Sequence, residues 1–144
     1  MRVKVEDVVL MEPVARKLLS YEWETPAKSY NVFKVINGVL EQNKFFLTEK
    51  SKLFKKYGVT EGEYIKIKPQ NEEKYKKEVN DLLEFQVEIP DVEFNMEDVF
   101  KSGYIESEDT ESKCEKLTPL DMYRIETFLN RIQDYSIALA KQDN

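Results

Sequence analysis

Four carboxylates close together are the residues of this chain that come nearest to a chemical site. They lie in the polar, aperiodic stretch 102–116 and are Glu106, Glu108, Asp109 and Glu111. Carboxylates bind hard divalent cations, but an EF-hand loop needs a glycine at its sixth position and a glutamate at its twelfth. This stretch has neither, and its spacing nominates no acid–base pair. We interpret 102–116 as a mobile, solvent-exposed acidic loop and expect neither a metal nor another cofactor.

The composition removes several kinds of catalytic centre. The chain has no histidine, which excludes Ser–His and Cys–His nucleophile pairs and histidine-bound zinc or iron. The single cysteine, Cys114, cannot form an internal disulfide and suits a reducing interior. Lys113 and Lys116 stand near it and could favour its thiolate, but an incidental exposed thiol is the simpler interpretation. None of the four glycines forms a phosphate-binding loop. We therefore predict that the chain is not an enzyme.

Two aromatic residues stand in a short polar connector. Tyr21 and Trp23 alternate there with Glu22 and Glu24. Such aromatics can anchor a protein partner when they are exposed. The alternative is that they fold back over the ends of the neighbouring helices, and the sequence leaves both open.

Lysines gather toward the end of the stretch 25–58. They are Lys44, Lys50, Lys52, Lys55 and Lys56. Nucleic-acid binders combine such a patch with exposed aromatics and a basic total charge, whereas this chain has a net charge of −6. We do not expect nucleic-acid binding. The charge is uneven, because residues 15–57 are net basic and residues 89–121 net acidic, which could steer a charged partner to one end.

The stretch from Thr25 to Gly58 is the clearest element that could position these residues. Its apolar residues form two adjacent stripes, 32/39/46/53 and 33/40/47/54, and the seven-residue spacing indicates a helix. Thr25 and Pro26 form a helix start, and Gly58 is expected to end the helix in a left-handed conformation. If this apolar face is wider than its neighbours cover, the remainder should be buried between subunits or against a partner.

The other elements complete a helix-dominated α+β fold, which we interpret as a single domain over 1–144. We expect a helix over most of 6–20 with an irregularity at Pro13, and an antiparallel helical hairpin over 6–58. A strand–helix–strand unit over 63–94 permits a small parallel strand pair. Asn95 and Asp98 offer a cap for a brief turn, and Thr118 caps a C-terminal helix over 119–140. No stretch has the length of a signal or membrane helix.

Four segments resemble a known family. They are VEDVVLMEPVARKLL, TPAKSYNVFKVINGVLEQNKFFLTEKSKLFKKYG, KPQNEEKYKKEVNDLLEFQVEIP and LTPLDMYRIETFL. In this order they are similar to a family of short proteins of unknown function, encoded by phages and prophages of Gram-positive bacteria. The loop 102–116 is longer than the family's pattern, and the residues beyond Leu129 do not match it. These motifs are helix caps, apolar faces and a strand end, so the resemblance implies no catalytic residues.

The resemblance implies a phage context, near tail and lysis genes. We therefore expect a non-enzymatic phage accessory protein that binds another protein in tail or virion assembly. Its partner would be a phage structural or host protein, or a second copy in a homo-oligomer; its location would be the bacterial host cytosol or the virion, with no membrane contact. The alternative is an acidic inhibitor that mimics nucleic acid and blocks a host or defence enzyme. Partner-binding residues would be Tyr21, Trp23, Glu106, Glu108, Asp109 and Glu111.

Overall fold

The computed structural model describes residues 1–102 and 116–142, with side chains through residue 134. Its elements are β1 (Arg2–Lys4), α1 (Val5–Leu19), α2 (Pro26–Tyr57), β2 (Gly58–Glu61), β3 (Tyr64–Ile67), α3 (Pro69–Glu84), β4 (Gln86–Glu88), α4 (Met96–Lys101) and α5 (Pro119–Gln142). The predicted helix-dominated α+β class is confirmed.

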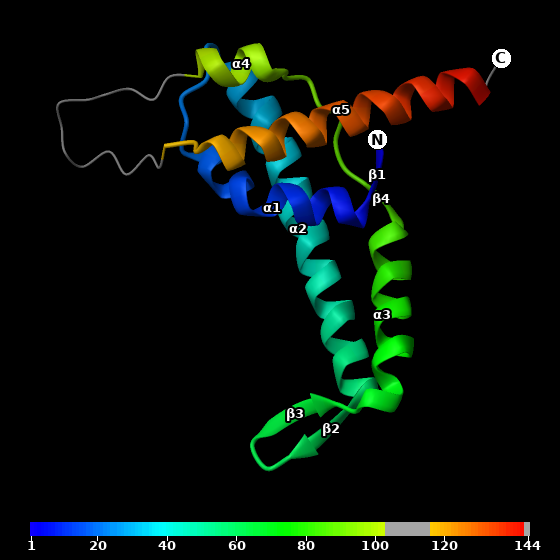
Figure 1. Ribbon diagram of the computed structural model, residues 1–144. Coiled ribbons are helices and arrows are strands. Elements are labelled where there is room, and N and C mark those ends of the chain that lie inside the picture. The colour runs from blue at the N-terminus through cyan, green and yellow to red at the C-terminus, as the bar shows by residue number, and fades with distance from the viewer. Residues whose placement is uncertain (103–115, 143–144) are drawn as a thin grey trace.

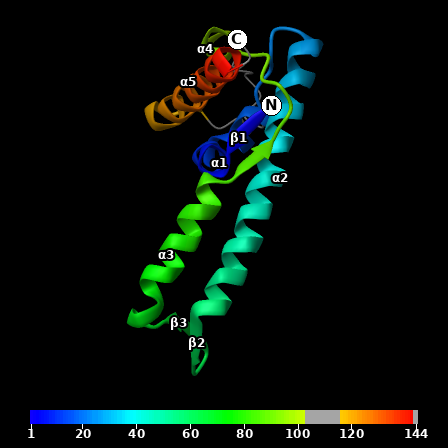
Figure 2. The same cartoon turned by 90° about the vertical axis from the view of Figure 1, so that its right-hand side faces the viewer.

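The molecule consists of a head and an arm (Figures 1 and 2). We define the head as β1, α1, the first part of α2, β4, α4 and α5. The arm is the rest of α2, from residue 40, together with the β2–β3 hairpin and α3. At about 1.5 Å per residue the 32 residues of α2 span roughly 48 Å. Because this is longer than the head, the second half of α2 projects from it.

Helix α2 begins and extends as its sequence predicts. Thr25 Oγ1 accepts a hydrogen bond from Lys28 N at 3.1 Å, and Pro26 is the first helical residue. Its end differs from the prediction, because Gly58 has φ −86° and ψ 153° and starts β2 in an extended conformation. A Cβ at position 58 would collide with the Ile65 side chain and the Phe54 carbonyl oxygen. The glycine therefore allows the hairpin to fold closely onto the end of α2.

Helix α1 packs between α2 and α5 in the head. The helix predicted over most of 6–20 is confirmed, and it continues through Pro13 without a break. Figures 1 and 2 show that α1 crosses α2 steeply, so residues 6–58 match the expected antiparallel hairpin only loosely. The reason is that α1 must bury side chains against two neighbours. The antiparallel neighbour of α2 is α3, in the arm.

Two short antiparallel strand pairs replace the parallel pair that the strand–helix–strand order permits. β1 pairs with β4, with Val3 opposite Val87, and β2 pairs with β3. The sequence did not predict β2. Gly62 lies in the turn between β2 and β3 and has φ 63°. Because α3 returns from the end of the arm to the head, it separates β3 from β4 and prevents their pairing.

The core of the head is built from several elements that are distant in sequence. Its largest fully buried side chains are Phe128, Met11, Leu18, Ile36 and Ile125. Helix α5 begins at the predicted cap, where Thr118 Oγ1 accepts from Asp121 N at 3.2 Å and Asp121 Oδ2 accepts from Thr118 N at 2.8 Å. The predicted turn after Asn95 is the helix α4, which starts with a capping box between Asn95 and Asp98.

Candidate functional site

Four of the six predicted partner-binding residues lie outside the described residues. They are Glu106, Glu108, Asp109 and Glu111, and the free cysteine Cys114 lies in the same segment. The acidic-loop hypothesis is therefore not tested by the structure. In the described ranges 1–102 and 116–142, no three potential metal-binding side chains gather into a group that could hold an ion.

The other two predicted residues, Tyr21 and Trp23, fold back onto the head. Tyr21 is buried in the core, and Trp23 is half-buried against it. The Trp23 indole Nε1 donates to the Leu18 carbonyl oxygen at 3.4 Å, and its ring lies 5.7 Å from that of Phe94. The sequence left open whether these aromatics are exposed anchors or fold back over the neighbouring helices, and they fold back. Both aromatics close the α1–α2 connector, where they stabilise the fold.

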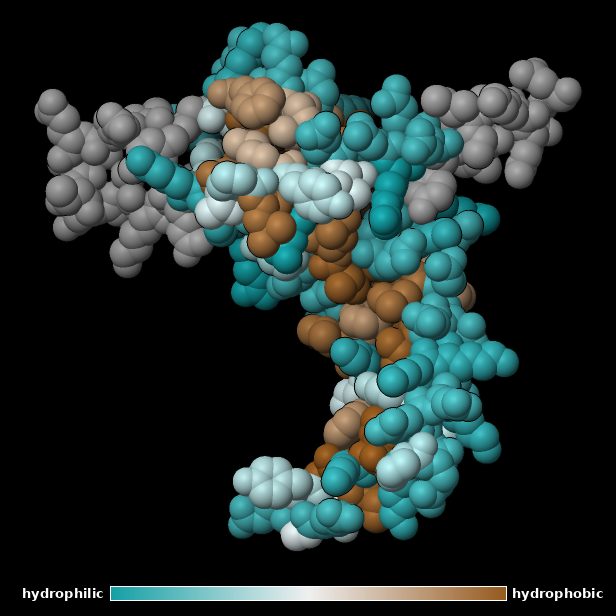
Figure 3. Space-filling model, in the orientation of Figure 1, coloured by the Kyte–Doolittle hydropathy of each residue, from teal (hydrophilic) through white to brown (hydrophobic). Residues whose placement is uncertain are grey.

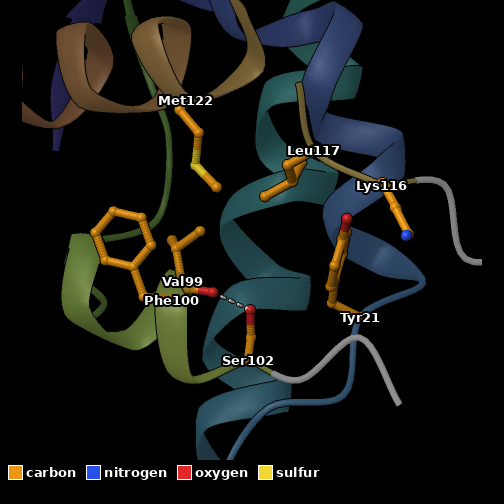
Figure 4. A pocket seen from close by; sticks show the side chains of 7 residues that line it. All are labelled: Tyr21, Val99, Phe100, Ser102, Lys116, Leu117 and Met122. Atoms are coloured by element: carbon orange, nitrogen blue, oxygen red, sulfur yellow. Dashed lines mark hydrogen bonds between the residues drawn. The ribbon is translucent and has the colours of Figure 1, made fainter. Parts of the chain in front are cut away.

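A pocket of about 430 Å³ opens beside Tyr21, between α4 and the start of α5 (Figure 4). Its other lining residues are Val99, Phe100, Ser102, Lys116, Leu117 and Met122. The Ser102 hydroxyl donates to the Val99 carbonyl oxygen, so it is engaged by the helix end. The lining is mostly apolar, and it suits packing better than acid–base chemistry. Residues 103–115 connect two of its edges and are not described, so we place no site here.

Helix α2 carries a row of apolar side chains that the fold leaves partly accessible. Of the two stripes on α2, the first is mostly buried: Val32, Val39 and Phe46 are at most 5% exposed, and Leu53 is half-buried. The second stripe is only partly covered: Phe33 is 51% and Leu47 is 55% exposed, whereas Leu40, which packs against the core, and Phe54 are half-buried. We call residues 33, 40, 47 and 54 the open stripe.

The open stripe runs past a groove at the corner where α1 crosses α2. This elbow groove has a volume of about 360 Å³, with Leu40, Asn43, Lys44 and Leu47 on its α2 side. Glu12 and Arg16 of α1 and Glu41 of α2 complete the lining. Figure 3 shows apolar side chains continuing from this hollow along the arm toward the hairpin. The head and the arm therefore form a concave surface with an apolar floor.

Helix α3 covers only part of the arm. All of its residues are exposed or half-buried, including those of its apolar face, Tyr75, Val79, Leu82 and Leu83. The Tyr75 ring packs edge-on against Phe54 at 6.2 Å between centroids. A pair of helices buries a single seam, so the apolar residues on its two sides stay accessible. In the hairpin, Tyr64 and Ile65 add further exposed apolar surface.

The lysines of the arm are partly neutralised. Lys52 pairs with Glu49 at 2.9 Å, and Lys56 pairs with Glu78 of α3 at 3.3 Å. The hydrogen bond to Glu78 raises the pKa of Lys56. Lys50 lies over the Phe46 ring at 5.8 Å. The basic patch predicted from the sequence therefore lies beside the open stripe and joins α2 to α3.

The carboxylates with perturbed pKa values have structural partners. The backbone hydrogen bond from Asn95 and the ion pair with Lys28 lower the pKa of Asp98, although burial opposes them. Burial acts to raise the pKa of Asp121, but hydrogen bonds from Thr118 and Lys17 outweigh it and the pKa is lowered. Each carboxylate caps a helix and holds a lysine from another element. They serve the fold, because the groups that lower their pKa values are lysines and the groups of the helix caps.

Comparison with family models, with curated proteins and with solved structures finds no match to this chain. The resemblance to the phage family therefore stays an expectation that rests on the quoted motifs. None of the helices in the described part of the chain combines the length and apolar character needed to cross a bilayer.

The sequence predicted two apolar stripes on α2, but it did not show which of them would be buried. Both stripes have the same seven-residue spacing, so periodicity cannot tell which one faces the head. The elbow groove was missed, because it needs residues of α1 that are more than twenty positions away from Leu40 in the sequence.

Proposed function

We propose that this protein is a non-enzymatic binding protein that docks another protein on the concave side of its arm. We further propose that it is a phage accessory protein acting in tail or virion assembly. The observation that carries the docking role is the exposed stripe beside a buried one on the same helix. The phage context rests on the sequence resemblance alone.

The energetics favour a partner on this surface. Burying a large aliphatic or aromatic side chain stabilises a complex by about 1.5–3 kcal/mol, and Phe33 and Leu47 are both more than half exposed. Association costs about 4–15 kcal/mol in lost motion, so these two residues would not suffice alone. The half-buried face of α3 and the hairpin extend the surface. A partner that follows the whole concave side would bury enough apolar area to bind.

The absence of an enzymatic role is supported by the residue chemistry. The chain has no histidine, and Asp98 and Asp121 hold helix caps and lysines. The elbow groove has Glu12 and Arg16 on its α1 side, 3.8 Å apart. A paired carboxylate and guanidinium beside leucines suit the rim of a binding surface.

Site-specific photo-cross-linking tests this proposal. A photoreactive residue replaces Leu47, and a matched control carries it at Leu120 of α5, because the two leucines are 55% and 54% exposed. Both variants are produced in infected or prophage-bearing cells, and the cross-linked proteins are identified by mass spectrometry. We expect a phage tail or virion protein linked at position 47 and absent at 120. Equal capture at both positions, or none at 47, would refute docking on the arm. A nuclease or defence protein linked at 47 would support the inhibitor hypothesis instead.

A further inference from the structure

We infer that the partner on the open stripe is an amphipathic helix with an acidic polar face, contributed by a different protein. This inference rests on the proposed docking function and names the class of its partner.

The spacing of the open stripe favours a helix. Phe33, Leu40 and Leu47 recur every seven residues along one uninterrupted helix, so they rise in steps of about 10.5 Å in a nearly straight row. A second helix laid along such a row meets each apolar residue at the same point of its own repeat. A strand or an irregular loop has no matching period. The elbow groove, at about 360 Å³, offers a recess for a side chain of that helix beside Leu40 and Leu47.

The charges beside the stripe select an acidic flank. The residues three and four positions from Leu47, which are its neighbours on the helix surface, are Asn43, Lys44, Lys50 and Ser51. Two are lysines and none is acidic. Lys44 and Lys55 are exposed and make no ion pair with any other described residue. Glutamates along the flanks of a docked helix would face these lysines.

The charges beside the elbow groove, near Leu40, have a different balance. Glu12 is held by Arg16 at 3.8 Å, and Glu41 is exposed near Lys44. The charges there offset one another. The acidic contacts of the partner helix are therefore expected at the end of the stripe nearer the hairpin, toward Lys50 and Lys55.

The same charges disfavour a second copy of this chain. A symmetric pair brings the same patch of both copies together. If two copies met stripe to stripe around Leu47, Lys44 of one would face Lys50 of the other, and like charges repel. A helix of opposite charge from another protein avoids this repulsion.

Two designed peptides test the inference with the full-length protein. Both are amphipathic helices with leucines at seven-residue spacing, and they differ only in carrying glutamate or lysine on the flanking positions. Binding is followed by fluorescence anisotropy at low and high salt. We expect the glutamate peptide to bind at least about tenfold more tightly at low salt, and salt to narrow the difference. Leu47→Gln should weaken glutamate-peptide binding by about tenfold or more, whereas the matched Leu120→Gln should not.

A charge-reversal variant tests the same claim without removing the stripe. In Lys44→Glu/Lys50→Glu/Lys55→Glu the preference should switch to the lysine peptide, while circular dichroism shows unchanged helix content. If both peptides bind equally and both lose affinity in Leu47→Gln, the acidic-helix inference is wrong but docking on the stripe stands. The same holds if neither peptide binds although cross-linking at position 47 captures a partner. A dimer in sedimentation equilibrium that Leu47→Gln dissociates would identify a second copy as the occupant and overturn the inference.

Discussion

The Lys17 amine lies 2.9 Å from Oδ2 of Asp121 and joins the last turn of α1 to the first turn of α5. At the other end of the same helices, Arg131 Nη1 lies 2.7 Å from Oδ1 of Asp7, which is fully buried. The two ion pairs show that α1 and α5 run antiparallel. They hold α5 against α1 at both ends of the contact between the two helices.

We predict that Asp121→Asn lowers the unfolding free energy by about 1–3 kcal/mol at neutral pH, because the substitution removes the charged carboxylate that accepts hydrogen bonds from Lys17 and Thr118. The pKa of Asp121 lies below its ordinary value of 3.8 in the folded protein. Its contribution is therefore complete above about pH 4 and is lost as the pH falls through the lower, folded-state value. Urea unfolding at a series of pH values should show the difference from wild type shrinking toward acid. The exposed Asp134→Asn is the control, and a pH-independent difference would contradict this account.

Arg131→Gln should destabilise the protein, because it leaves the fully buried Asp7 carboxylate without its guanidinium partner. Removing one partner of a fully buried pair costs about 3–5 kcal/mol; Arg131 itself is partly exposed, so we expect about 1–3 kcal/mol here. Arg124→Gln, on the same helix, should change stability by less than about 0.5 kcal/mol. Thermal unfolding of the two variants measures this, and equal effects would show that the ion pair is not the cause.

Phe46 belongs to the buried stripe of α2, and its neighbour Leu47 belongs to the open stripe. Phe46→Ala should cost about 3–5 kcal/mol, as truncation of a buried phenylalanine does, because this side chain is 5% exposed. Leu47→Ala should cost less than about 1 kcal/mol in the isolated protein. Chemical denaturation tests the pair. A large effect of Leu47→Ala, without a partner present, would show that the open stripe is covered within the protein.

Gly38→Ala has two opposing effects on stability, at a buried position of α2. Alanine favours a helix by about 1 kcal/mol over glycine, but its Cβ would lie 2.7 Å from Cδ of Pro90. Because the proline ring is rigid, we expect the clash to prevail and the midpoint of thermal unfolding to fall. Asn37→Ala, exposed on the next position, should leave it unchanged or raise it. A stabilised Gly38→Ala variant would mean that the segment after β4 can move away from α2.

The local features of the chain were determined by its sequence. The caps formed by Thr25, Asn95 and Thr118 were predicted and are present. Their hydrogen bonds join residues three positions apart, so a few neighbouring side chains decide where a helix starts. The same holds for the length of α2, because its apolar repeat and its two ends lie within one segment.

The tertiary structure alone decided which surfaces meet. Either of the two stripes has the spacing of a core-facing helix surface. Val39 is buried and Leu47 is exposed because of where α1 and α3 pack against α2. The Arg131–Asp7 ion pair joins residues 124 positions apart, and Gly38 accommodates the close approach of Pro90. Such contacts depend on the arrangement of whole helices, because hydrophobic burial is non-directional and does not by itself determine which surfaces pack together. The open stripe is therefore encoded by the sequence, but the packing of the head and arm makes it a surface for another molecule.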